Sequence, residues 1–116
     1  MTHDPQMLKG VLALLLLSVL REEAGYGYGI VTRLKAAGFE DLAEGTVYPA
    51  LSRLESAGLL ESHLEPSASG PARKYYRTTP AGVAELAARG RAWRSLVAAV
   101  DTVTGAAPPV TEGETA

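Results

Sequence analysis

Residues 44–55 constrain the fold of this chain most strongly, because they have the pattern of a short helix with one apolar face. Val47, Leu51 and Leu54 recur at helical spacing and mark the inner face. The outer face carries small, hydroxylated, aromatic and cationic side chains, namely Thr46, Tyr48, Pro49, Ser52 and Arg53. Hydroxyls and Arg bind phosphates or base edges, and small residues allow close approach. The segment is therefore predicted to be a helix suited to a DNA groove, ending at Gly58.

The composition is that of one modest domain with one core, because the chain has 116 residues of which 47% are hydrophobic. It has no cysteine, which excludes disulfides and thiolate metal sites and suits a reducing cytoplasm. A net charge of −2 is unusual for a protein that binds nucleic acid, but the distribution of charge matters more than the sum. No acidic residue lies between Glu65 and Glu85, and Arg73, Lys74 and Arg77 fall inside that window.

An apolar run from Val11 to Leu17 is too short to cross a membrane, since a spanning helix needs about 20 apolar residues. Arg21-Glu22-Glu23 follows it in place of the small residues of a signal-peptide cleavage site. We expect a buried core helix and no membrane association.

The first half of the chain is predicted to form three helices with tight connections. After a loose arm, residues 6–23 form the first helix, 25–29 a glycine-rich turn, 30–37 the second helix and 39–43 a link to the third. Residues 59–64 and 72–78 then have the character of strands, joined by a loop over 65–71 that is rich in Pro, Ser and Gly. This is the layout of a winged helix, with Arg73 and Lys74 placed on the wing to meet a sugar-phosphate backbone.

A last helix is predicted to begin at Thr79-Pro80, with Thr as N-cap and Pro in the first turn. Its apolar positions follow steps of three and four, a heptad seam made by Val83, Leu86, Gly90, Trp93, Val97 and Val100. A single winged-helix domain does not need such a seam for its own core, so the helix is predicted to pair with a second copy of the chain. We thus expect a winged-helix domain over residues 6–79, a dimerisation helix over 80–103 and a disordered tail over 104–116, in a fold that is mainly α with a small β-hairpin wing.

With these residues in view, the chain resembles the PadR family of bacterial transcription regulators over about residues 7–103. The resemblance rests on the order and spacing of six pieces: Tyr26-Gly27-Tyr28-Gly29-Ile30, Gly45-Thr46-Val47-Tyr48-Pro49-Ala50-Leu51, Arg53-Leu54-Glu55, Gly58-Leu59, Gly70-Pro71-Ala72-Arg73-Lys74-Tyr75-Tyr76 and Thr79-Pro80-Ala81-Gly82. The single C-terminal helix is similar to that of the short PadR subfamily.

The resemblance implies a homodimer in which the last helix of one subunit packs on the first and last helices of the other, so that Leu12 and Leu16 would join the seam residues in the interface. It also implies a cytoplasmic repressor of a neighbouring transporter or detoxification gene and of its own promoter. Some members are released from DNA by aromatic or cationic hydrophobic compounds at the dimer interface. The chain departs from the family at Ala43, a poor N-cap where a Ser or similar residue often stands, and Pro49 leaves the Gly45 carbonyl without its helical hydrogen bond.

Several candidate residues have a functional and a structural interpretation. Tyr48 either contacts a phosphate or packs at the rim of the core, and Arg53 meets either a phosphate or a nearby carboxylate. Because side chains alternate along a strand, Arg73 and Lys74 lie on opposite faces, and only one of them is expected to make the main phosphate contact. Tyr28 is a candidate backbone contact, whereas Tyr26 is a candidate cover for the core.

Trp93, with Val97 beside it, either anchors the dimer core through the large area of its ring or also stacks on a flat ligand between symmetry-related helices. His3 and His63 lack a thiol or carboxylate cluster at ligand spacing, so no metal is expected. The chain also shows no phosphate loop, Ser/His/Asp set or paired carboxylates, which argues against an enzyme and against a cofactor.

The residue patterns and the PadR resemblance together predict a homodimeric DNA-binding regulator. The resemblance implies a repressor, which we expect to bind a pseudo-palindromic operator and to be released by a small aromatic effector. The alternative is a winged-helix module that binds another protein and has no DNA function.

Overall fold

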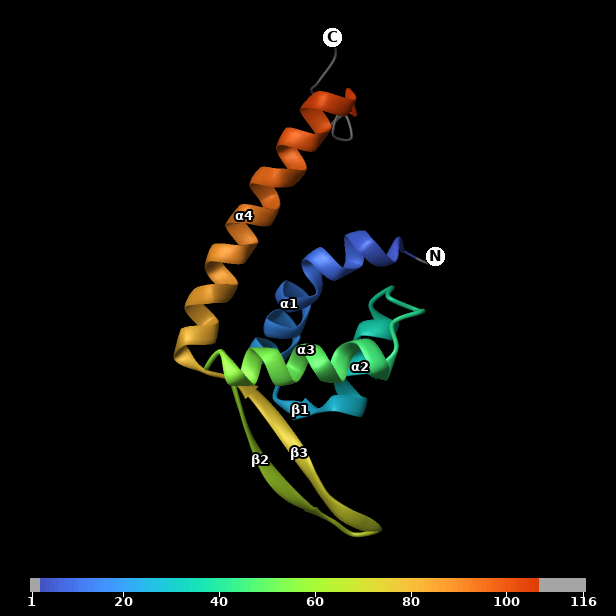
Figure 1. The fold of residues 1–116 in the computed structure, drawn as a ribbon, viewed down its shortest axis with the longest axis vertical. Helices are drawn as coiled ribbons and strands as arrows, with labels where there is room; N and C mark the ends of the chain where they lie inside the picture. Colours follow the sequence, from blue (N-terminus) through green and yellow to red (C-terminus); the bar gives the residue numbers. More distant parts are fainter. Residues whose placement is uncertain (1–2, 107–116) are drawn as a thin grey trace.

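The structure, a computed structural model, describes residues 3–106. In chain order it contains α1 (Pro5–Glu22), β1 (Gly25–Tyr26), α2 (Gly27–Ala36), α3 (Glu44–Ser56), β2 (Leu60–Ser67), β3 (Gly70–Thr78) and α4 (Pro80–Thr104). Figure 1 shows α1, α2 and α3 gathered at the centre, the β2–β3 hairpin extending to one side and the free end of α4 extending to the other. The fold is a winged helix, as predicted.

The core lies where α1, α2 and α3 meet the base of the hairpin. Leu16 and Leu17 of α1, Ile30 of α2 and Val47 and Leu51 of α3 are all 0% exposed. The central apolar run of the first helix is thus a core segment, and no helix within residues 3–106 is long and apolar enough to cross a membrane.

The hairpin belongs to a three-stranded antiparallel sheet of order β1-β3-β2. Gly25 and Tyr26 pair with Tyr76 and Tyr75, so the two residues form a strand, and α2 begins at Gly27. The prediction of a turn over 25–29 and of a helix beginning at Ile30 was therefore wrong. The partners of this short strand lie some fifty residues further along the chain, so local glycine content gave no sign of it.

The loop predicted over residues 65–71 was also too long. Leu64 pairs with Lys74, Glu65 with Arg73 and Ser67 with Gly70, which leaves only residues 68–69 between the strands. An irregularity between Glu65 and Ser67 accommodates Pro66 in the outer strand, where a missing N–H is tolerated. Cross-strand pairing thus extends the wing beyond the point where the proline and glycine signals end it.

Helix α4 begins where predicted, because Thr79 is its N-cap and accepts a hydrogen bond from the Gly82 N–H at 3.0 Å. The Thr79 hydroxyl also donates to the Gly58 carbonyl at 2.7 Å, which ties the start of α4 to the end of α3. The helix extends through Thr104, and Gly105 ends it with φ +74. Thr104 is therefore helical, and residues 107–116 of the predicted tail lie outside the described residues.

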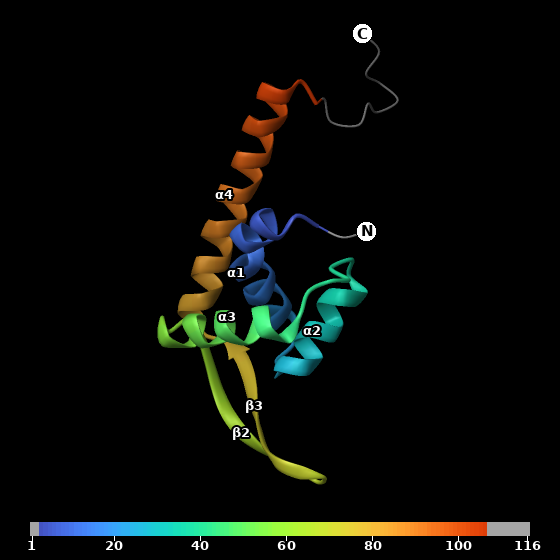
Figure 2. The ribbon, with the colours of Figure 1, turned by 45° about the vertical axis from the view of Figure 1, so that its right-hand side comes forward.

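The first half of α4 packs beside α1, and the second half continues beyond the rest of the molecule, as Figures 1 and 2 both show. Leu86 packs against the core, and Val83 is partly buried. The heptad seam is thus divided, because its first half covers the core of its own chain.

Candidate nucleic-acid interface and ligand site

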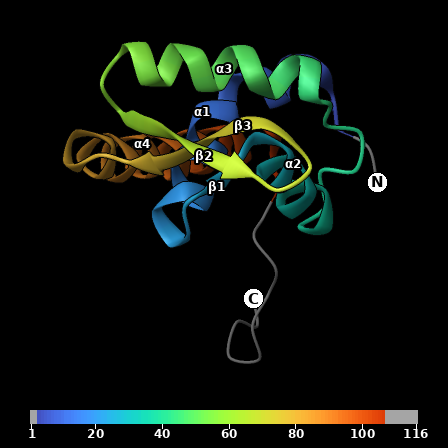
Figure 3. The same ribbon diagram turned by 90° about the horizontal axis from the view of Figure 1, so that it is seen from below.

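Helix α3 and the β2–β3 hairpin lie side by side on one face of the molecule, seen from below in Figure 3. Five of the predicted DNA-binding residues border a single hollow of about 750 Å³ on this face: Tyr28, Tyr48, Ser52, Arg73 and Lys74. Tyr26, Gly27 and Tyr76 complete its lining. Residues from α2, α3 and the wing are therefore brought together by the fold.

The other predicted DNA-binding residues, Thr46, Pro49 and Arg53, are exposed on α3 at spacings of three and four. They form a row next to the one that carries Tyr48 and Ser52, and they do not border the hollow. Among the described residues Arg53 has no ion-pair partner, so the carboxylate suggested for it from the sequence is absent there. The outward residues of α3, Thr46, Tyr48, Pro49, Ser52 and Arg53, are all exposed.

Tyr48 is positioned by Gly27. A Cβ on Gly27 would lie 2.0 Å from Cε1 of Tyr48, so the ring rests directly on the glycine backbone at the start of α2. The Tyr48 side chain nevertheless remains 41% exposed. Partial burial, followed by the charge of Glu44, raises the pKa of Tyr48, so its hydroxyl stays protonated at neutral pH and can donate a hydrogen bond.

The two cations of the wing have different surroundings. The Arg73 guanidinium lies 5.8 Å from the centre of the Tyr26 ring. The Lys74 Nζ donates to Oε1 of Glu55 at 3.2 Å. Tyr28 is 64% exposed, and Tyr26 donates to Glu65 at 3.4 Å and packs edge-on against Tyr75. Tyr26 therefore contacts the wing, whereas the sequence suggested that it covers the core.

Sequence reasoning missed the contribution of Glu55 and Gly27 to this face. The only signal of Glu55 was its place after Arg53-Leu54 at the end of the predicted helix, and Gly27 was attributed to turn geometry. Both roles depend on contacts between segments distant in the sequence. The Ala43 N-cap, by contrast, was predicted correctly: it makes no side-chain hydrogen bond to the start of α3.

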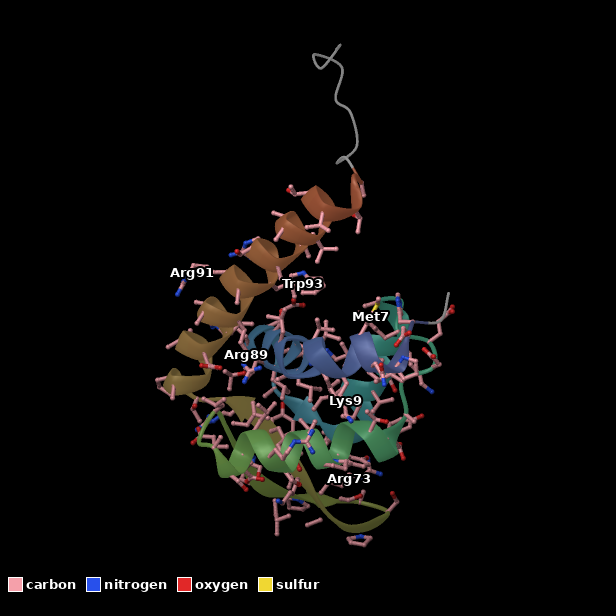
Figure 4. The ribbon with its side chains drawn as sticks, turned by 45° about the horizontal axis from the view of Figure 1, so that its top comes forward. Met7, Lys9, Arg73, Arg89, Arg91 and Trp93 are labelled. Carbon is pink, nitrogen blue, oxygen red and sulfur yellow. The ribbon has the colours of Figure 1, made fainter. Side chains whose placement is uncertain are left out.

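A second candidate site lies on the free half of α4, where Trp93, Val97 and Asp101 contribute to an open hollow of about 590 Å³. Figure 4 shows Trp93 projecting from α4 toward the side where Met7 of α1 lies, whereas Arg91 points away. Trp93 is 43% exposed, and Leu96, Val100 and Val103 are 56%, 48% and 87% exposed. Only Gly82 is buried among the residues of α4.

Two residues predicted for the dimer interface lie elsewhere. Leu12 and Leu16 are 4% and 0% exposed and belong to the core of their own chain. They have almost no surface to offer a partner, because the single chain already buries them.

The chain is similar to known regulators over most of its described length. The family described as "Transcriptional regulator PadR-like family" matches residues 16–88. The transcriptional regulator Rv3488 of Mycobacterium tuberculosis is 41% identical over 71 residues, which span 61% of this chain and 64% of that relative.

Solved structures give the same picture. A PadR-like transcriptional regulator from Bacillus cereus superimposes with a TM-score of 0.74 and 37% identity, covering 85% of this chain and 96% of the other. A PadR family transcriptional regulator from Eggerthella lenta gives a TM-score of 0.80 and 37% identity, covering 88% of each chain.

Proposed function

The chain belongs to the PadR-like family of transcriptional regulators, and from this premise we propose that it is a homodimeric repressor that binds a pseudo-palindromic DNA operator. Membership of the family makes the protein a transcriptional regulator and not an enzyme. The proposal adds the DNA-contacting residues, the dimer and the effector.

The observation that carries the proposal is the hollow that joins α3 to the wing. Its rim presents hydroxyl groups from Tyr28, Tyr48 and Ser52 and the cations of Arg73 and Lys74. Hydroxyl donors and cations are the groups that bind phosphates and fix the register of a protein on a duplex. The neighbouring row of Thr46, Pro49 and Arg53 would then face the bases, with Thr46 and Pro49 small enough to approach a thymine methyl group.

The free half of α4 supports the homodimer. Its exposed Trp93, Leu96 and Val100 form an apolar stripe along the half of α4 that extends beyond the rest of the described chain. A second copy of the same helix would bury this stripe and place two α3 helices on one side of the dimer. Because Leu12 and Leu16 are buried in their own chain, we leave them out of the interface and assign it to the exposed and half-exposed α4 residues, including Gly90 and Val97.

In this arrangement the two α3 helices would enter successive major grooves about one helical turn apart, which makes the operator a pseudo-palindrome. The two wings would bind the flanking backbone. The protein would act in the cytoplasm, where bacterial DNA lies.

The effector site would lie between the two α4 helices at Trp93 and Val97. A flat aromatic compound stacked on Trp93 would alter the separation of the helices and hence the spacing of the two α3 helices. Titration of planar aromatic compounds, one cationic and one anionic, should change Trp93 fluorescence and weaken DNA binding together. Fluorescence changes without any change in DNA affinity would contradict the role of an effector.

The proposal is tested by fluorescence anisotropy of labelled DNA from upstream of the gene, with scrambled DNA as the control, at two salt concentrations. We expect preferential binding that weakens steeply with salt, because each phosphate contact contributes about 0.9 to the slope of log K against log salt.

Absence of binding at low salt would favour the alternative, a winged-helix module that binds another protein. The observation in favour of that alternative is the net charge of −2, which is unfavourable near a polyanion. An apolar protein interface would respond little to salt, so the same titration separates the two functions.

A further inference from the structure

One carboxylate connects the end of α3 to both strands of the wing. Oε2 of Glu55 accepts a hydrogen bond from the Ser62 hydroxyl of β2 at 2.5 Å, and Oε1 accepts one from Lys74 Nζ of β3 at 3.2 Å. Ser62 pairs with Tyr76, and Leu64 pairs with Lys74, so Ser62 and Lys74 are diagonal neighbours on the face of the hairpin that meets α3. Glu55 therefore links the end of α3 to both strands of the hairpin.

The contacts of Glu55 keep both partners charged. The hydrogen bond from Ser62, followed by that from Lys74, lowers the pKa of Glu55. The hydrogen bond to Glu55 raises the pKa of Lys74. At neutral pH the carboxylate and the ammonium group thus form an ion pair, with side-chain exposures of 52% for Lys74 and 30% for Glu55.

The pair stands at the edge of the proposed DNA interface. Lys74 borders the hollow together with Arg73 and Tyr48. Among the described residues, Arg73 has no carboxylate partner, so its charge is available to a phosphate. Lys74 has the position of a phosphate ligand, but its charge is already balanced by Glu55.

We propose that Glu55 is a positioning residue that docks the wing on α3 and, in doing so, withholds the charge of Lys74 from the DNA backbone. The inference rests on the proposed DNA binding. It assigns phosphate binding on the wing mainly to Arg73 and makes Glu55 a residue that limits affinity. Because the pair is partly exposed, its effect is a reduction of affinity and not a block.

The two possible roles of Glu55 predict opposite changes in DNA affinity when its carboxylate is removed. If Glu55 only braced the wing, its loss would loosen the hairpin and weaken DNA binding. If it withholds Lys74, Glu55→Gln keeps a hydrogen-bond acceptor for Ser62, releases one cation per subunit and strengthens DNA binding.

The experiment compares the salt dependence of DNA binding for the wild type, Glu55→Gln, Lys74→Gln and the double variant. Two cations released per dimer should steepen the slope of log K against log salt by about 1.8 in Glu55→Gln, at about 0.9 per phosphate. The gain in affinity should accordingly shrink about tenfold between about 50 and 200 mM salt. Lys74→Gln alone should lower the slope by much less than about 1.8, because Glu55 already balances that charge in the wild type. The double variant should return to about the wild-type slope.

Glu61→Gln is the matched control. Glu61 accepts from Arg77 Nε at 2.6 Å in another exposed ion pair between the strands of the hairpin, and neither residue borders the hollow. Its loss should leave the slope at the wild-type value. Thermal unfolding of every variant establishes that the hairpin remains folded.

Three results would overturn the inference: an unchanged slope in Glu55→Gln, weaker binding by that variant, or a slope already reduced by about 1.8 in Lys74→Gln. If Glu55→Gln does not fold, the slope of Lys74→Gln alone decides whether Glu55 withholds the charge of Lys74 or only braces the wing. A wild-type protein that fails to bind DNA would overturn the proposed function as well, whereas DNA binding with an unchanged slope in Glu55→Gln overturns this inference only.

Discussion

Two regions of the molecule differ in how far a single chain buries their apolar residues. One is the α3–wing face, made by α3 and the β2–β3 hairpin, and the other is the free half of α4 that extends beyond the rest of the described chain. On the α3–wing face, Val47, Leu51 and Leu60 are 0%, 0% and 2% exposed. The outward residues of α3 are polar or small apart from Tyr48, and Leu64 of the hairpin is an exposed aliphatic residue at 66%. On the free half of α4, Leu96, Val100 and Val103 are 56%, 48% and 87% exposed. Most apolar residues of the α3–wing face are buried within a single subunit, whereas the free half of α4 exposes an apolar stripe of the kind that marks an interface.

Under the proposed function the two regions would bind different partners, DNA at the α3–wing face and a second copy of the chain at α4. The core beneath α3 would hold that helix rigidly against DNA. A 25-residue helix with one buried residue has little tertiary packing of its own, and most helical stability in proteins comes from packing of an apolar face. Changes in α4 should therefore act on assembly, and changes around α3 should act on stability or DNA contact.

The largest effect is expected from Val97→Asp, which places a charge in the apolar stripe of α4. We expect monomers in light scattering coupled to size exclusion, and a loss of at least about 100-fold in operator affinity, since linked half-sites gain 10²–10⁴-fold in avidity. Ser95→Asp adds the same charge one turn after Arg91, on the side of the helix that points away from Trp93, and should remain dimeric. A Val97→Asp protein that remained dimeric would show that the apolar stripe of α4 is not the subunit interface.

Gly82→Ala should give the next largest effect, on stability. A Cβ on Gly82 would lie 2.1 Å from the backbone oxygen of Leu59, so the start of α4 would have to move away from α3. Such overpacking costs about 1–3 kcal/mol, measurable by urea unfolding. Gly29→Ala is the control, because a Cβ there meets nothing within 4 Å. Equal stability of the two variants would contradict the close approach of the Gly82 backbone to the Leu59 carbonyl oxygen.

Gly27→Ala should separate DNA contact from stability. The atoms nearest to the added Cβ belong to the Tyr48 ring, the closest at 2.0 Å, and this half-exposed side chain can rotate away. We expect DNA affinity to fall about tenfold, the equivalent of one hydrogen bond of about 1.4 kcal/mol, with the free energy of unfolding changed by less than about 1 kcal/mol. Affinity equal to that of the wild type would exclude Tyr48 as a DNA contact.

Ala43→Ser should stabilise the protein modestly by supplying the missing N-cap of α3. A serine hydroxyl there would accept a hydrogen bond from the first turn, worth about 0.5–1 kcal/mol in urea unfolding. Ala43→Val, which offers no acceptor, should leave stability unchanged. A serine variant no more stable than the valine variant would mean that solvent already satisfies the first turn.

The smallest effect concerns pH and Glu55. Because its folded-state pKa is lowered, mainly by Ser62 and Lys74, its contribution to stability is present above its ordinary pKa and is lost as pH falls through the lowered folded value. The difference in melting temperature between the wild type and Glu55→Gln should therefore shrink from pH 7 to pH 3. A difference that stays constant across this range would show that the charge of Glu55 contributes nothing to docking.

Particular residues show how far sequence reasoning reached. Periodicity identified the inner face of α3, and Thr79-Pro80 identified the start of α4, because both depend on neighbours within one or two turns. The wing strands were predicted too short and β1 was missed, because Pro66, Pro71 and Gly25 carry local signals that cross-strand pairing overrides. Tyr28, Tyr48, Ser52, Arg73 and Lys74 were predicted individually, but their convergence on one hollow was not.

The sequence by itself determined the types of the longer elements, the buried face of α3, the division of charge along the chain and the family. These follow from periodicity, capping and motif spacing, which act over a few residues. The tertiary structure decided which half of the α4 seam remains free, that Leu12 and Leu16 belong to the core, and that Glu55 holds Lys74. Each of these depends on contact between segments far apart in the sequence, and such contacts exist only once the chain has folded.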